Sequence, residues 1–229
     1  MVPGERPANS DEPRMRPVSP TSCRQRLPTW HTLLVHAVAN ELLVDLREAL
    51  RSSSDRSACV EAVATCASDE EIERPPMWRY WRALPPKGQI GILFGSWYTA
   101  PIIDRVFKRT KTKDLMRSVD EINHFEKMLA DEGALVLKFW FHLGKDPQKK
   151  RLLALEADPE TRWRITRRDW KFFDKYDRFY SISENVLRQT SMSWAPWIVV
   201  EGANPEYRAA TVGKTLLDVR RSCARLGHD

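Results

Sequence analysis

The sequence lacks the features that mark several common classes of protein. No stretch approaches the roughly 18 consecutive apolar residues of a membrane-spanning helix, which excludes an integral membrane protein. The proline-rich first 20 residues contain no apolar segment typical of a secretory signal, so we expect a cytoplasmic protein. The four cysteines form no Cys-x-x-Cys pair and have no histidines at ligand spacing, which predicts reduced thiols and no zinc site.

Lysine and large side chains are also scarce, but only in the first third of the chain. Residues 1–74 contain no Lys, Phe or Tyr, and Trp30 is their one aromatic residue. Because a chain needs buried apolar surface to offset the entropy of ordering, we expect a low-order segment over residues 1–67. One amphipathic helix is predicted within it, over residues 29–50, and a loop or weak helix without a strand pattern follows.

The remainder, residues 68–229, has the composition of a folded domain. Apolar runs typical of buried strands alternate there with stretches of helical periodicity. Strands are predicted over residues 88–95, 134–143 and 197–202, and helices over 112–130, 146–158, 204–223 and, as one long helix, from a capping box at Thr166 and Asp169. This alternation predicts an α/β fold whose parallel sheet is covered by helices on both faces.

A Gly-Lys-Thr triplet at residues 213–215 invites interpretation as a phosphate-binding loop. The first glycine of the G-x-x-x-x-G-K-[ST] pattern would fall at Arg208, and Gly202 lies too far back for a loop whose amides converge on a phosphate. Lys214 is therefore interpreted as a solvated helix residue. The sequence contains no other phosphate loop of this pattern.

Basic residues concentrate between Lys145 and Lys171. A charge run is usually a solvated face, yet helical spacing before the turn at Asp158 and Pro159, with further cations after it, would let the segment clamp a polyanion from two sides. The candidate phosphate-binding residues are Lys145, Lys149, Lys150, Arg151, Arg162 and Arg164. The tryptophans at 163, 194 and 197 are expected to fill core rather than to stack on a base.

A second basic run, from Arg105 to Arg117, follows the segment Ser96-Trp97-Tyr98. Ligands bind beyond the carboxyl ends of the strands in open parallel sheets, and this segment directly follows a predicted strand. Ser96 and Tyr98 are therefore candidates for an active-site loop, with packing against the sheet as the alternative. No base or G-x-S-x-G elbow lies nearby, so Ser96 is not expected to be a nucleophile.

Three segments, taken in order, resemble the polyphosphate kinase 2 family. They are WRYWRALPPKGQIGILFGSWY, INHFEKMLADEGALVLKFWFHLGKDPQKKRLLALEADPETRWRIT and TSMSWAPWIVVEGANPEYRAATVGKTLL. The variant FGSWY and the stretch EGANPEY are closest to the amino-terminal half of two-domain polyphosphate:AMP phosphotransferases. The resemblance covers roughly Ser68 to Arg221, with a weak echo in LREAL at residues 46–50.

The resemblance implies a three-layer P-loop kinase fold and phosphoryl transfer between polyphosphate and a nucleotide such as AMP or ADP. It also implies magnesium, for which the sequence identifies no ligand. In the family, the segment equivalent to residues 145–168 belongs to a lid whose cations hold the phosphate chain. The resemblance thus favours phosphate binding for the six cations named above.

Two departures from the family pattern predict an incomplete domain without catalytic activity. The phosphate loop should lie between a first strand and a helix upstream of Arg74, yet only 17 residues separate Leu50 from Ser68 and none forms such a loop. Phe94 and Gly95 stand where active members carry an Asp-Arg pair. Since phosphoryl transfer depends on positioning and charge stabilisation, these losses predict a noncatalytic chain whose sheet lacks its first strand.

The expected ligands are accordingly polyphosphate and a nucleotide. The alternative function is a polyanion- or RNA-binding scaffold without phosphotransferase activity, although nucleic acid is the less favoured ligand. An incomplete sheet also predicts association, either as a homo-oligomer or with a separate catalytic domain.

Overall fold

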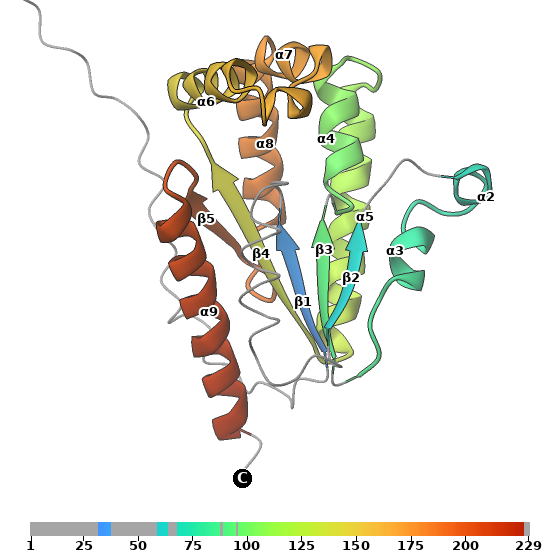
Figure 1. Cartoon of the computed structure of the whole chain (residues 1–229). Coiled ribbons are helices and arrows are strands. Elements are labelled where there is room, and N and C mark those ends of the chain that lie inside the picture. The colour runs from blue at the N-terminus through green and yellow to red at the C-terminus, as the bar shows by residue number, and fades with distance from the viewer. Residues whose placement is uncertain (1–31, 38–58, 64–67, 88, 95, 227–229) are drawn as a thin grey trace, which may run out of the picture.

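A five-stranded parallel sheet forms the centre of the described part of the chain (Figure 1). The computed structural model describes residues 32–37, 59–63, 68–87, 89–94 and 96–226. Within these residues the strand order is β2-β3-β1-β4-β5. The strands are β1 (Thr32–Ala37), β2 (Cys59–Val63), β3 (Ile90–Phe94), β4 (Ala134–His142) and β5 (Trp197–Glu201).

The two N-terminal strands correct the sequence prediction. Residues 32–37 form β1 and not part of a helix over 29–50, and Cys59–Val63 forms β2 where a loop or weak helix was expected. Residues 38–58 lie outside the described part of the chain. The expected gap in the sheet is also wrong, because β1 pairs in register with both β3 and β4. A short apolar run such as TLLVHA suits a helix face and a buried strand equally. Here it forms a strand, because it pairs with edges of β3 and β4 that would otherwise be unpaired.

The helices cover both faces of the sheet and its upper end. They are α2 (Asp69–Ile72), α3 (Trp78–Arg82), α4 (Thr99–Val106), α5 (Thr112–Asp131), α6 (Lys145–Ala157), the 3-10 helix η3 (Arg162–Arg164), α7 (Arg167–Phe173), α8 (Tyr176–Thr190) and α9 (Pro205–Leu226). No helix in the described residues is long and apolar enough to cross a membrane.

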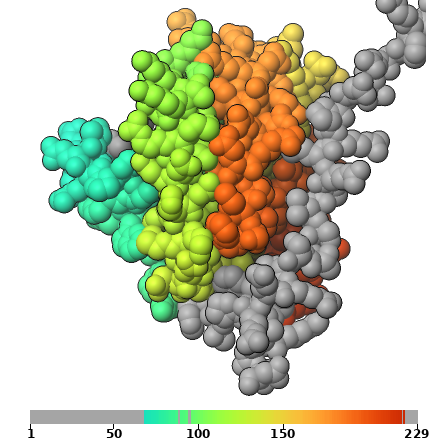
Figure 2. All heavy atoms as spheres, turned by 180° about the vertical axis from the view of Figure 1, so that it is seen from behind, coloured from blue at the N-terminus to red at the C-terminus, as the bar shows by residue number. Residues whose placement is uncertain are grey.

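Two apolar clusters, one on each face, make the structure three-layered. The larger cluster joins α4, α5 and α8 to the sheet, and Figure 2 shows these helices side by side in green and orange. The smaller cluster contains Ile92, Phe139 and Val200 of the sheet and Val212 of α9, which lies on the opposite face (Figure 1). The predicted α/β fold with a doubly covered parallel sheet is therefore confirmed.

The single long helix predicted from Thr166 is divided into α7 and α8. The capping box at its start is confirmed, since Asp169 accepts from the Thr166 amide at 2.7 Å and hydroxyl at 2.6 Å. The chain leaves the helical path at Asp174 and Lys175. Tertiary packing explains the break, because α7 lies across the top of the molecule whereas α8 runs down against α4 and α5 (Figure 1).

The C-terminal end of α4 contains a residue in the left-handed region. Lys108 has a φ of 60°, and the amide of Arg109 donates to the carbonyl of Asp104 at 2.8 Å to close the helix end. Glycine is the usual residue at such a position, because a β-carbon is strained there.

Replacing Lys108 by glycine is therefore expected to raise the free energy of unfolding by up to about 1 kcal/mol, the relief of strain exceeding the entropy that glycine adds to the unfolded chain. Urea denaturation measures the change. The control is Lys108→Ala, which removes the charge but keeps the β-carbon. An equal gain in both variants would assign the effect to charge and contradict the strain.

Candidate functional site

Three short helices lie across the carboxyl ends of the strands and together form the lid, residues 145–173 (Figure 1). Leu143 and Gly144 connect β4 directly to α6. No residue of α6 is buried, so this helix contributes charge to the surface and little to the core. The lid thus holds the predicted basic segment over the edge of the sheet at which open parallel folds bind ligands.

The predicted cations of the lid are available to solvent to different degrees. Lys149 and Lys150 on α6 are exposed. Lys145, also exposed, makes an ion pair with Asp177 at 2.5 Å. Such an exposed pair contributes only about 0–1 kcal/mol and leaves Lys145 able to exchange Asp177 for another anion. Arg151 is half-buried, and burial, followed by the positive charge of Arg208, lowers the pKa of its guanidinium.

The two remaining predicted cations lie on η3, which folds back onto the end of α6. Arg162 donates from Nε to the carbonyl of Glu156 at 3.0 Å, and the guanidinium of Arg164 lies 5.4 Å from the centre of the Trp163 ring. Both arginines are exposed. The structure therefore brings all six predicted residues together on one helix and the short turn that follows it.

Trp163 does not fill the core as expected. Its side chain is 74% exposed and donates from Nε1 to the carbonyl of Glu160 at 2.9 Å. The turn that carries it is attached to α6 by hydrogen bonds from Thr161 and Arg162 to backbone carbonyls. Trp197, by contrast, is 4% exposed and belongs to the larger core cluster, as predicted.

A cavity of about 390 Å³ lies between α4 and α7 and joins the two basic runs of the sequence. Its lining contains two phenylalanines, Phe107 and Phe172, whose ring centres lie 5.1 Å apart. Arg109, Arg168 and Lys171 supply three cations to the same lining, which includes no carboxylate. A volume of this size is typical of small-molecule sites, and its surface suits a ligand with an apolar ring and an anionic group.

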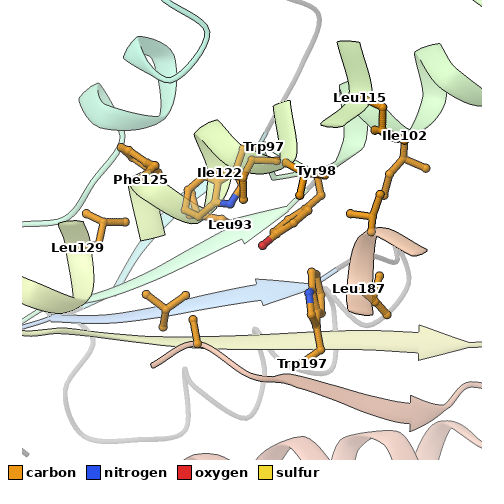
Figure 3. Close-up of a cluster of buried hydrophobic side chains, with 14 of the residues drawn as sticks. Leu93, Trp97, Tyr98, Ile102, Leu115, Ile122, Phe125, Leu129, Leu187 and Trp197 are labelled. Carbon is orange, nitrogen blue, oxygen red and sulfur yellow. The ribbon is translucent and has the colours of Figure 1, made fainter. Parts of the chain in front are cut away.

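Ser96 and Tyr98 follow β3 directly, but both are 1% exposed. The Tyr98 hydroxyl donates to Oε1 of Glu126 at 2.6 Å, and its ring packs 4.8 Å from that of Trp197 (Figure 3). A role for Ser96 and Tyr98 in an active-site loop stays a prediction. The contacts of Tyr98 assign it to the packing of the core, which was the alternative interpretation.

A fully buried ion pair lies at the centre of this packing. Lys138 of β4 contacts Glu126 of α5 at 2.7 Å, and both side chains are 0% exposed. The ammonium also donates to the Thr190 carbonyl at 2.7 Å and to the Tyr98 hydroxyl at 3.0 Å, and Trp97 donates from Nε1 to Glu126 at 3.0 Å. Each of these neighbours compensates one of the two charges, which is the condition under which a buried pair is tolerated.

Burial and charge shift the pKa values of two of these groups in opposite directions. Burial lowers the pKa of the Lys138 ammonium, against the influence of Glu126. Burial, and after it the negative charge of Glu126, raises the pKa of the Tyr98 hydroxyl far above its ordinary value. Tyr98 is therefore a proton donor in this network and not an ionisable catalytic group.

Sequence reasoning missed this pair, although two signals for it were visible. Lys138 interrupts the apolar run ALVLKFWFHL, and Glu126 lies on the apolar face of the helix over residues 112–131. Opposite charges inside two elements that pack together indicate a buried ion pair, because neither charge is tolerated there alone.

The part of the chain that the structure describes contains no preformed cluster of magnesium ligands. Mg²⁺ prefers carboxylate oxygens, and no group of three His, Cys, Asp or Glu side chains that could hold a metal occurs among the residues that the structure describes. Glu201, at the end of β5, already accepts from the amides of Ala203 at 2.6 Å and Asn204 at 3.3 Å.

The strand order, the covered sheet and the lid define a P-loop-kinase-like α/β protein. A family model described as Polyphosphate kinase 2 matches residues 46–223. The chain belongs to the polyphosphate kinase 2 family, which confirms the resemblance seen in the sequence. The match begins before Ser68 and includes β2, in agreement with the place of that strand in the sheet.

Individual relatives agree with this assignment. The chain is 54% identical over 151 residues to the polyphosphate:AMP phosphotransferase of Pseudomonas aeruginosa, covering 66% of this chain and 30% of the relative. It is 32% identical over 157 residues to the AMP/ADP-polyphosphate phosphotransferase of Meiothermus ruber, covering 69% of this chain and 59% of the relative. The chain thus spans less than two thirds of the length of these relatives.

Solved structures show the same fold. A polyphosphate kinase 2 structure from Pseudomonas aeruginosa matches with a TM-score of 0.72 and 40% identity, over 85% of this chain and 40% of that one. Polyphosphate kinase 2 from Arthrobacter aurescens matches with a TM-score of 0.76 and 26% identity, over 83% of this chain and 68% of that one.

Removing one partner of the buried pair should be strongly destabilising. Lys138→Met leaves the Glu126 carboxylate buried without its cation and is expected to cost about 3–5 kcal/mol of unfolding free energy. The double variant Lys138→Met/Glu126→Gln should recover part of this loss. Denaturant unfolding measures both, and a double variant at least as unstable as the sum of its single variants would contradict the ion-pair explanation.

The raised pKa of Tyr98 predicts a loss of stability at high pH. The unfolded tyrosine ionises near pH 10 while the folded one keeps its proton, so the contribution is complete below about pH 10 and is lost as the pH rises further. Tyr98→Phe should reduce the slope of unfolding free energy between pH 10 and 11 by up to about 1.4 kcal/mol per pH unit. Tyr207→Phe, at an exposed tyrosine, is the control and should leave the slope unchanged.

Proposed function

We propose that this chain is a polyphosphate-binding domain of the phosphotransferase family that does not by itself transfer a phosphoryl group. The observation that carries the proposal is the lid, on which the six predicted cations lie over the carboxyl edge of the sheet. Its relatives are named phosphotransferases of polyphosphate and AMP or ADP, and this supports the same ligands here.

The lid suits a chain of phosphates for two reasons. The side chains of Lys149, Lys150, Arg162 and Arg164 are exposed, so their binding to a ligand requires no side chain to leave the core. Guanidinium groups take phosphate oxygens bidentately, while the lysines act as mobile point charges that tolerate a flexible ligand. Phosphate groups repeated along a polymer would meet several of these cations at once.

A nucleotide is the proposed second ligand. AMP or ADP combines an apolar base with anionic phosphate, and the cavity between α4 and α7 offers both kinds of surface in Phe107, Phe172 and three cations. The second basic run of the sequence contributes to this ligand through Arg109 and not through Ser96 or Tyr98.

The proposed absence of phosphoryl transfer rests on charged groups that the sequence lacks. The sequence contains no G-x-x-x-x-G-K-[ST] loop. Phe94, the last residue of β3, and Gly95 stand where active members of the family carry an acidic residue followed by an arginine. Phosphoryl transfer is accelerated almost entirely by positioned charges around the transferred group. Losing the loop lysine and this pair should lower the rate by many orders of magnitude.

One observation favours a second function, binding of single-stranded RNA. Trp163 is 74% exposed and lies between the exposed arginines 162 and 164. An aromatic ring flanked by cations is typical of surfaces on which bases stack while the backbone is neutralised. Polyphosphate has no base, so this ring would contribute to RNA binding alone.

The lid is tested by the triple variant Lys149→Ala/Lys150→Ala/Arg162→Ala. Its affinity for long-chain polyphosphate at low salt is expected to fall at least about tenfold. The affinity should also depend less steeply on salt concentration, because about two fewer counterions are released on binding. The matched control removes three exposed lysines elsewhere, Lys87→Ala/Lys113→Ala/Lys214→Ala. An equal loss in the control would show that net charge alone, and not the lid, attracts polyphosphate.

Two further measurements separate the alternatives. Trp163→Ala should leave polyphosphate affinity unchanged and weaken RNA only if the RNA function holds. Wild-type chain incubated with AMP, polyphosphate and magnesium should form no more ADP than the triple variant, and a rate clearly above that variant would overturn the noncatalytic half of the proposal.

A further inference from the structure

The arm, residues 68–87, projects from the side of the molecule. It contains α2 and α3, and Figure 2 shows it in blue-green beside the green helices α4 and α5. Its second half is anchored, because Met77, Tyr80 and Leu84 pack against the larger core cluster. The Tyr80 ring lies 5.4 Å from that of Trp97 in an edge-to-face contact. Its first half has no such anchor, since no residue of α2 is buried.

Contacts within the arm hold its two halves against each other. Ser68 and Glu71 form a capping box at the start of α2, in which the Glu71 amide donates to the Ser68 hydroxyl at 3.3 Å. The Glu71 carboxylate also lies 3.7 Å from the Arg79 guanidinium and so links α2 to α3. The arm is therefore preorganised, and a preorganised surface loses less conformational entropy when it binds a partner.

Two large apolar side chains are exposed on the arm, one on each half. Ile72 of α2 is 70% exposed, and Trp81 of α3 is 52% exposed. The Trp81 ring lies 5.9 Å from that of Phe125 on α5, and Met128, about one turn further along α5, is 37% exposed. A single exposed apolar residue is ordinary, but several on one projecting element and the helix beside it indicate an interaction surface.

The charges of the arm are divided between the same two halves. The charged residues within residues 68–73 are all acidic, and those within residues 74–87 are all basic. The exposed members of the two groups are Asp69, Glu70 and Glu73 in the first half and Arg74, Arg82 and Lys87 in the second. A surface that is acidic at one end and basic at the other is complementary to a copy of itself turned by half a rotation.

This division of charge selects a second copy of the chain as the occupant. A uniformly acidic or uniformly basic partner would leave one half of the arm facing like charge, which is unfavourable. In a two-fold interface, by contrast, both halves meet opposite charge, because the first half of each copy faces the second half of the other.

We propose that two copies of this chain associate through their arms about a two-fold axis. The acidic half of each arm faces the basic half of the other, and Ile72 of each copy lies against Trp81 of the other. Tryptophan and arginine are enriched at the centres of protein interfaces, which agrees with the composition of the second half. The gap in the sheet from which association was first expected does not exist, so the arm provides a different basis for it. The association goes beyond the proposed function and does not depend on it.

Sedimentation equilibrium of the full chain over a range of concentrations measures the association. Wild-type chain should form a dimer at low salt and dissociate more readily at high salt, because salt screens exposed charges. Ile72→Ser tests the apolar contact. Since α2 has no buried residue, this change should leave the folded monomer unaltered and weaken the dimer at least about tenfold.

Charge reversal tests the two-fold arrangement. The first arm variant is Asp69→Lys/Glu70→Lys/Glu73→Lys, which makes both halves of the arm basic. The second arm variant is Arg74→Glu/Arg82→Glu/Lys87→Glu, which makes both halves acidic. Each arm variant alone should be monomeric, because like charges then meet across the axis. An equimolar mixture of the two should form a dimer again, because a basic arm then meets an acidic arm.

Two matched controls place the same changes of charge on the lid and α9, away from the arm (Figure 1). They are Glu156→Lys/Glu160→Lys/Glu206→Lys and Lys149→Glu/Lys150→Glu/Lys214→Glu, all at exposed positions. Both controls should remain dimeric. Loss of the dimer in the controls as well would assign the effect to net charge and contradict a role for the arm.

The remaining outcomes also decide the proposal. A wild-type chain that is monomeric at every concentration would refute it and leave the arm to a different partner. A dimer that persists in either arm variant, or a mixture of the two variants that stays monomeric, would refute it as well. Circular dichroism checks that each variant is folded. If an arm variant does not fold, Ile72→Ser decides, and an unchanged association constant in that variant refutes the proposal.

Discussion

The buried ion pair between Lys138 and Glu126 is the interaction on which the arrangement of this molecule depends. It joins β4 to α5, and the groups that complete it come from the segment after β3, through Tyr98, and from the end of α8, through Thr190. Neither charge is tolerated alone in a dry interior, so all four elements must be in place for either to be satisfied. The pair thereby fixes β4, the strand from which the chain enters the lid, against α5.

The same constraint explains how function is distributed over this edge. Tyr98 contacts the pair and serves packing, whereas the cations proposed to bind ligands lie on the lid and at Arg109. Among the described residues, Lys138 and Arg208 are buried cations. Glu126 neutralises Lys138, whereas Arg208 donates to the carbonyl of Gly202.

Much of the fold was predictable because strong local signals agreed with the tertiary outcome. The capping box at Thr166 and the left-handed Gly133, with its φ of 84°, mark helix boundaries where they were expected. The prediction was wrong at residues 32–37, because the run TLLVHA has no local preference strong enough to exceed the gain from pairing with two strands at once. The prediction that Trp163 fills the core was wrong for a related reason. Apolar character alone does not show whether another part of the structure covers a side chain.

Residue order alone specified the class of fold, the family and the set of cations on the lid, because periodicity, caps and charge runs are properties of neighbouring residues. The pairing of Lys138 with Glu126 and the cavity between α4 and α7 were decided only when the chain folded. Each of these joins residues from separate elements, and whether a charge is neutralised, repelled or left for a ligand depends on distances that no local pattern encodes.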